Sequence, residues 1–224
     1  DNYRPGVMKK LGIDYDTDST TNPRVIYLSI TGTGPTGPYV KRPAYDTVGQ
    51  GLGGMLSLLM HAKDPRPIGP NYADSLSGMF ACFGVLGAIA ARARTGKGQQ
   101  VDTTMAGSTL AFLIAPATDA LATGKAPGPY TRPMQSQTYA FSGSDGLAFA
   151  IHLSSPQKFW EGLCNAAGHP ELIDDPRFST RPSRRKNYDE LARVFAEFFR
   201  EKPRAHWMEQ LELNDVPHTP VYDM

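Results

Sequence analysis

The stretch Arg24-Val-Ile-Tyr-Leu-Ser-Ile-Thr31 and the loop Gly32-Thr-Gly-Pro-Thr-Gly37 after it decide the fold class of this 224-residue chain. The first stretch is β-branched and apolar and is bounded by Pro23 and Gly32, which is typical of a buried strand in a parallel sheet. Three further elements are predicted: a glycine-rich helix from Tyr45 to about Met60, an apolar helix over Leu76–Arg94 that ends at Gly96, and a strand over Gln99–Thr103. Because strands and helices alternate, the pattern predicts an α/β fold.

The apolar helices of this region should be buried. Leu76–Arg94 has almost no polar face before Arg92, so most of its surface is expected to lie in the core. Another apolar helix is predicted after Thr103, with an interruption at Pro116.

The character of the chain changes after Thr123. Gly124–Pro133 is rich in Gly and Pro, which is typical of a linker. Beyond it, two short apolar runs flank Ser142-Gly-Ser-Asp-Gly146 and predict a β-hairpin. Two helices are expected near Tyr188–Arg200 and Arg204–Leu213. We therefore expect an α/β unit before residue 125 and a small α+β domain after it.

Composition and charge argue against some classes of partner. A hydrophobic content of 40% and a charged content of 20% are ordinary for a globular protein. The net charge of +1 gives no broad field for nucleic acid or an anionic membrane. The basic run Arg181–Lys186 is expected to be a solvated segment that leads into a helix. The same run is also able to bind phosphates. The apolar stretches Ser75–Ala91 and Thr103–Thr118 fall short of a bilayer span, so no membrane partner is expected.

The cysteines and histidines predict neither a disulfide framework nor a metal site. The two cysteines, Cys82 and Cys164, lie far apart in the sequence, and no CxxC spacing occurs. Cys82 lies in an apolar helical run and is expected to be a buried, reduced thiol. The five histidines have no metal-ligand spacing. A reducing, cytoplasmic location and no metal are expected.

The loop Gly32–Gly37 matches the dinucleotide-binding pattern G-x-G-x-x-G. Its context argues against a nucleotide site, because Pro35 and Pro38 remove backbone N–H donors that pyrophosphate would need. The next helix also begins too late, after Pro43.

Asp74 precedes the apolar helix and has two interpretations. Either Asp74 or Ser75 is the predicted N-cap, and Asp is a favoured residue there. Alternatively, Asp74 is a carboxylate nucleophile, kept ionised by the N–H groups at the helix end, which would also support negative charge developing beside it. The residues alone leave both interpretations open.

Several short motifs follow one another through the chain. The first 110 residues contain Asp1-Asn-Tyr-Arg-Pro-Gly-Val-Met-Lys-Lys-Leu-Gly12, Asn22-Pro-Arg-Val-Ile-Tyr-Leu-Ser-Ile-Thr-Gly32, Gly37-Pro-Tyr39, Arg42-Pro-Ala-Tyr-Asp46, Ala73-Asp-Ser-Leu-Ser-Gly78, Ala91-Arg-Ala-Arg-Thr-Gly-Lys-Gly-Gln99 and Val101-Asp102. The second half contains Asp145-Gly146, Phe159-Trp160, Asp175-Pro-Arg-Phe178, Val216-Pro217 and Pro220-Val221. In this order the motifs resemble those of the family III CoA-transferases, whose relatives include carnitine and formyl-CoA transferases and α-methylacyl-CoA racemases.

The resemblance implies a Rossmann-like large domain and a small α+β domain in an interlocked homodimer. It assigns residues 1–123 to the C-terminal portion of the large CoA-binding α/β domain and residues 124–137 to a linker. Residues 138–224 form the small domain and the start of a segment that returns to the large one. The family's N-terminal βαβ segment, which supplies part of the CoA site, is missing from this chain and is expected to precede it.

The resemblance also implies a reaction. The residue at the position of Asp74 is the nucleophile that attacks an acyl-CoA thioester, and an aspartyl-CoA thioester then passes CoA to a small carboxylic acid. CoA enters as the substrate thioester. By the same resemblance the CoA site is lined by Asn2, Tyr3, Lys10 and Leu11, with Arg42 near the phosphates.

Tyr45 bears on the type of reaction. The racemases of this superfamily place a histidine at this position, next to Asp46, as one of two acid/base groups. An unperturbed tyrosine, with a pKa of about 10, is a poor replacement at neutral pH. Tyr45 therefore favours transfer. The alternatives are an acyl-CoA racemase or isomerase on the same fold, and a non-catalytic CoA-binding dimer scaffold.

Overall fold

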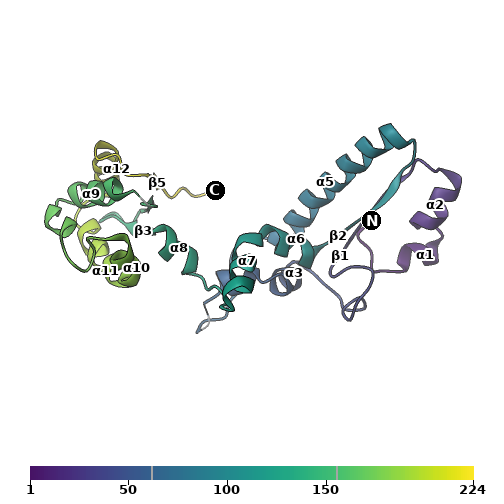
Figure 1. The fold of residues 1–224 in the computed structure, drawn as a ribbon, viewed down its shortest axis with the longest axis horizontal. Helices are drawn as coiled ribbons and strands as arrows, with labels where there is room; N and C mark the ends of the chain where they lie inside the picture. The colour runs from purple at the N-terminus through teal and green to yellow at the C-terminus, as the bar shows by residue number, and fades with distance from the viewer. Residues whose placement is uncertain (62, 155) are drawn as a thin grey trace. The chain divides into compact units, whose positions relative to one another are not determined.

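The computed structural model describes residues 1–61, 63–154 and 156–224, and the chain divides into two compact units (Figure 1). The units are Asp1–Pro129 and Tyr130–Met224. The division lies within the segment 124–137, for which the sequence predicts a linker. Part of that segment, Thr131–Ser136, forms helix α8 of the second unit.

The first unit is built on two parallel strands. Its elements are α1 (Val7–Leu11), α2 (Tyr15–Thr21), β1 (Ile26–Thr31), α3 (Asp46–Leu52), α4 (Met55–Leu59), α5 (Tyr72–Thr95), β2 (Gln99–Thr104), α6 (Met105–Phe112) and α7 (Ile114–Thr123). Strands β1 and β2 pair in parallel with Leu28 opposite Val101, which confirms both predicted strands and the parallel sheet. The expectation that the first strand is buried is wrong, because every residue of β1 is only half-buried. Helix α5 runs beside the strands (Figure 1) and packs so closely that a Cβ at Gly84 would lie 2.5 Å from Val101 Cγ1.

Two helix predictions are wrong in this unit because the breaks occur at other residues. The single helix expected from Tyr45 to about Met60 is divided into α3 and α4, with Gly54 between them at φ 86°. The helix expected to break at Pro116 breaks at Leu113, where α6 and α7 bend by 76°. Pro116 lies in the first turn of α7, where a backbone N–H has no partner within the helix.

The predicted burial of α5 is also wrong within the described chain. Met79, Phe83, Leu86 and Ile89 are exposed, and Cys82 is exposed beside them. Only one side of α5 contacts β1, β2, α3 and α6, so the opposite side has no cover in this unit. By length and composition α5 could cross a membrane, a property that core helices of soluble proteins share.

The second unit packs helices against a small antiparallel sheet. Its elements are α8 (Thr131–Ser136), β3 (Thr138–Ser142), β4 (Ala148–His152), α9 (Gln157–Ala166), the 3₁₀ helix η1 (Pro170–Ile173), α10 (Arg181–Lys186), α11 (Tyr188–Phe199), α12 (Arg204–Leu213) and β5 (His218–Pro220). The strand order is β3-β4-β5. The predicted hairpin is confirmed, with Gly146 at φ 74° between β3 and β4. The helices expected near Tyr188 and Arg204 are confirmed as α11 and α12.

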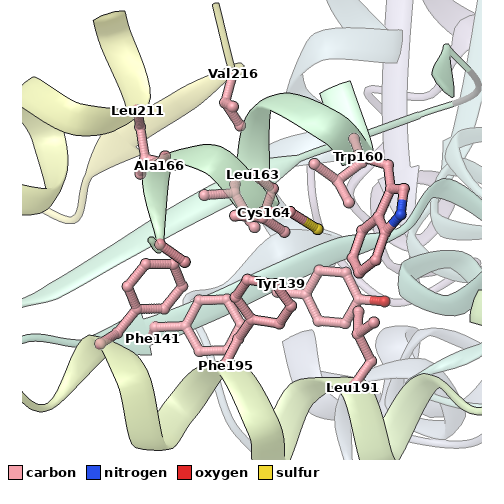
Figure 2. Close-up of a cluster of buried hydrophobic side chains, with 14 of the residues drawn as sticks. Tyr139, Phe141, Trp160, Leu163, Cys164, Ala166, Leu191, Phe195, Leu211 and Val216 are labelled. Atoms are coloured by element: carbon pink, nitrogen blue, oxygen red, sulfur yellow. The ribbon is translucent and has the colours of Figure 1, made fainter. Parts of the chain in front are cut away.

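Aromatic side chains fill the core of the second unit (Figure 2). Phe141 of β3 and Phe195 of α11 lie in this cluster with Trp160 of α9. The rings of Trp160 and Phe195 meet edge to face, with centroids 5.9 Å apart.

The basic run Arg181–Lys186 is not simply a solvated segment, because Arg184 is buried with 1% of its surface exposed. Its Nε donates to Gln137 Oε1 at 2.7 Å, and its Nη1 donates to the Phe178 carbonyl at 2.8 Å. The guanidinium lies 5.0 Å from the centre of the Trp160 ring. Burial lowers the pKa of Arg184 below its ordinary value. Arg184 is therefore a structural residue of the core.

Cys164 gives a first testable prediction. Its thiol is buried in the core, and burial raises its pKa from 9.0 to about 12. In native protein at pH 8, iodoacetamide should therefore leave Cys164 unmodified, whereas Cys164 should react fully in urea. Because the folded pKa is raised, the contribution of this thiol to stability is present below pH 9 and is lost as the pH rises toward 12. Rapid labelling of native Cys164, read by peptide mass spectrometry, would contradict this packing.

Candidate active site

A cavity of about 440 Å³ in the first unit brings together most of the predicted site residues. Those that line it are Asn2, Tyr3, Arg42, Tyr45 and Asp74. Lys10 and Leu11 do not line it, because they lie on the exposed helix α1. The cavity opens beside the C-terminal end of β1, which is where parallel sheets commonly bind ligands.

Asp74 lies in the first turn of α5, and it is not the N-cap. The helix begins at Tyr72 with Asn71 at the cap position, so the expectation of Asp74 or Ser75 as N-cap is wrong. Among the described residues, no hydrogen bond involves the Asp74 carboxylate, whereas its backbone N–H has an acceptor. The carboxylate therefore remains available to a ligand in the cavity.

The carboxylate that caps α5 belongs to Asp46 instead. Asp46 Oδ1 accepts from the backbone N–H of Ala73 at 2.8 Å and of Asp74 at 3.2 Å. Its Oδ2 accepts from the side-chain amide of Gln50, one turn later in α3. A residue 28 positions upstream thus provides the negative charge that the start of the helix favours.

Glycines allow the close approach of α3 that this contact requires. A Cβ at Gly49 would lie 2.9 Å from Ala73 Cβ and 2.7 Å from Met105 Cβ, so a side chain there would push α3 away from α5 and α6. Likewise, a Cβ at Gly32 would lie 2.2 Å from Ala44 Cβ, so Gly32 lets the segment before α3 cross the end of β1. These contacts position Tyr45 and Asp74 around one cavity.

Cations and a tyrosine line the remaining wall. The Arg42 guanidinium lies 4.0 Å above the Tyr39 ring, a cation–π contact that orients it. Tyr45 is 82% exposed. Arg4 also lines the cavity and was not predicted as a site residue, although it follows Asn2 and Tyr3 directly in the sequence. The cavity therefore presents two cations, Arg4 and Arg42, to an anionic ligand. It also presents the Asp74 carboxylate, which accepts no hydrogen bond among the described residues.

Within residues 1–61, 63–154 and 156–224, no group of three or more His, Cys, Asp or Glu side chains could hold a metal ion.

Removing the Asp46 carboxylate should loosen the start of α5. We expect Asp46→Ala to lower the free energy of unfolding by about 1–3 kcal/mol, because two N–H groups and the Gln50 amide lose their acceptor. Asp46→Asn keeps an acceptor oxygen and should lose less. Urea titration followed by circular dichroism measures the difference, and an Asp46→Ala protein as stable as wild type would contradict the capping role.

Comparison with known proteins adds a family relationship to this geometry. The family model described as CoA-transferase family III matches residues 1–224. The acetyl-CoA:oxalate CoA-transferase of Acetobacter aceti is 37% identical over 232 residues, which cover 100% of this chain and 58% of that protein. The succinyl-CoA:glutarate CoA-transferase of Mus musculus is 32% identical, over 99% of this chain and 51% of that protein.

A solved structure also matches almost the whole of this chain. The crystal structure of a CAIB/BAIF family protein from Brucella suis superposes with a TM-score of 0.85 at 33% identity, covering 99% of this chain and 59% of that one. The chain therefore spans between about half and three-fifths of the length of the proteins it matches.

Proposed function

This chain belongs to CoA-transferase family III, and from that membership we propose that it is part of an enzyme that moves CoA from an acyl-CoA thioester to a free carboxylic acid, with Asp74 as the nucleophile. The observation that supports Asp74 as the nucleophile is that Asp46, and not Asp74, accepts the hydrogen bonds at the start of α5. Asp46 caps α5, so the carboxylate of Asp74 has no structural partner among the described residues and lines the cavity.

The proposed reaction begins with an attack by Asp74. One carboxylate oxygen attacks the thioester carbonyl, the C–S bond breaks, and a mixed anhydride and CoA thiolate form. The thiolate then attacks the aspartyl carbonyl of the anhydride, which gives an aspartyl-CoA thioester and releases the donor acid as a carboxylate.

The acceptor acid reverses these steps. Its carboxylate attacks the aspartyl-CoA thioester, giving a second mixed anhydride and CoA thiolate. The thiolate attacks the acceptor's acyl carbon, so the new acyl-CoA leaves and the carboxylate of Asp74 is regenerated. No proton is consumed, so the protein's task is to hold the partners and exclude water from the anhydrides.

The other site residues have supporting roles in this proposal. Arg42 and Arg4 supply positive charge for CoA phosphates or a carboxylate, and Asn2 and Tyr3 line the path beside them. Lys10 and Leu11 remain proposed CoA contacts on the family resemblance alone. On the same basis we propose that further strands complete a Rossmann-like sheet. We also propose that the protein is an interlocked homodimer in the cytoplasm. The exposed apolar side of α5 supports the presence of further protein around this unit.

Tyr45 supports transfer over racemisation. Tyr45 is 82% exposed and places a phenol where the racemases of the superfamily place an acid/base histidine. It can still donate a hydrogen bond to an oxygen in the cavity.

The test uses the full-length protein with an acyl-CoA and isotope-labelled free acids, including oxalate, glutarate and formate. Label appearing in a new CoA thioester is the expected result. Exchange of the α-proton without new thioester would indicate the racemase alternative, and neither product with any acid tested would leave a CoA-binding scaffold.

A further inference from the structure

A second cavity, of about 310 Å³, lies in the second unit and is strongly cationic. It is lined by Arg132, Gln135, Ser136, Ser154, Arg181 and Arg185. Half of these side chains are guanidinium groups, and none of the described residues that line the cavity carries a carboxylate. Because the net charge of the chain is only +1, this concentration of positive charge is local.

Among the described residues, few of the donors that line this cavity have an acceptor. The Nε–H of Arg181 is buried and has no hydrogen-bond partner among the described residues, while its Nη2 donates to the Gln135 carbonyl at 3.0 Å. In the same part of the chain, no ion pair involves Arg132 or Arg185. Buried donors are normally satisfied, so an orphaned Nε–H beside two further guanidinium groups points to an acceptor that occupies the cavity.

Hydrogen bonds to the buried core hold Ser136 and Ser154, the two serines that line the cavity. The N–H of Ser154 donates to the Ser136 carbonyl at 2.9 Å, and the side-chain amide of Gln137 donates to the Ser154 carbonyl at 2.6 Å. Gln137 is held in turn by Arg184. Both Gln137 and Ser154 adopt left-handed φ values, of 52° and 51°, which cost energy in residues other than glycine. A buried network maintains this geometry.

We propose that this cavity binds a phosphate-type dianion. A phosphate group offers three terminal oxygens that can accept from several guanidinium forks and hydroxyls at once, whereas a carboxylate offers two oxygens and one charge. The cavity has enough donors for three phosphate oxygens. They are the guanidinium groups of Arg132, Arg181 and Arg185 and the hydroxyls of Ser136 and Ser154. The cavity is larger than one phosphate, so it has room for free phosphate or for the phosphate monoester of a larger molecule. The 3′-phosphate of CoA is the probe for the second source, a choice that rests on the proposed function.

The test is calorimetric titration of the full-length protein at constant ionic strength, with inorganic phosphate as the probe and chloride as the reference. The test variant is Arg132→Gln with Arg185→Gln, and because both residues are exposed we expect the fold to be kept. The matched control is Lys186→Gln with Arg200→Gln, which removes the same charge from exposed positions outside the cavity. We expect saturable phosphate binding that weakens by at least about tenfold in the test variant and less than about twofold in the control.

Titrations with CoA and with CoA lacking its 3′-phosphate distinguish the two sources. Displacement of phosphate by CoA alone would identify the monoester, and displacement by neither would identify free phosphate; both results support the site. Absence of phosphate binding beyond the chloride reference would overturn the proposal. So would equal weakening in test and control variants, or tighter binding of malonate than of phosphate.

Discussion

Replacing Asp74 with Asn should lower the rate of CoA transfer by at least about 10³-fold, because an amide cannot form the acyl anhydride. The fold should survive, since Asp46 rather than Asp74 accepts the N–H groups at the start of α5. We expect the melting temperature of Asp74→Asn to stay within about 2 °C of wild type, as for other exposed substitutions. Initial rates of transfer and a thermal melt measure the two effects.

Asp119→Asn is the matched control for this experiment. Asp119 is an exposed aspartate on α7 of the same unit, and it does not line the cavity. Its replacement removes the same charge and should leave the rate within about twofold, in line with small surface effects. A similar loss in both variants would attribute the effect to net charge, and an Asp74→Asn enzyme of normal activity would remove Asp74 from the mechanism.

Replacing Arg184 with Ala should destabilise the second unit by about 3–5 kcal/mol, the largest stability change we expect in this chain. The change leaves a void beneath Trp160 and removes the donors that satisfy Gln137 and the Phe178 carbonyl. Both tryptophans of the chain, Trp160 and Trp207, lie in this unit, so tryptophan fluorescence in urea follows its unfolding separately.

Two further variants separate the causes. Arg184→Met restores much of the volume without the donors, so it should recover only part of the loss. Lys186 lies on the same helix but is exposed, so Lys186→Ala should change the free energy of unfolding by less than about 0.5 kcal/mol. Equal stability of Arg184→Ala and Lys186→Ala would show that the buried network does not stabilise the unit.

Elements with a local signal could be predicted from the sequence. The β3–β4 hairpin has its own turn residues, α11 and α12 have their own boundaries, and the apolar run of β1 needs only a neighbouring strand. In each case the information lies within a few consecutive residues. The site residues Asn2, Tyr3, Arg42, Tyr45 and Asp74 were selected through ordered motifs, and they line one cavity.

Features that depend on distant partners could not be predicted. The start of α5 is set by Asp46, which lies 28 positions before Asp74, and no local pattern shows which of two carboxylates caps the helix. Three adjacent cations of α10 look alike in sequence, although only Arg184 is buried. The apolar composition of α5 correctly indicates a helix but cannot show how much of its surface this chain covers.

The most direct test of the central claim is chemical trapping of the covalent intermediate on the full-length protein. Acyl-CoA is added, the reaction is quenched with hydroxylamine or borohydride, and the peptides are sequenced by mass spectrometry. Hydroxylamine should convert the aspartyl-CoA thioester to a hydroxamate on Asp74 alone, only when acyl-CoA is present, and not in Asp74→Asn. An adduct on another residue, or rapid transfer with no adduct on Asp74, would contradict the account.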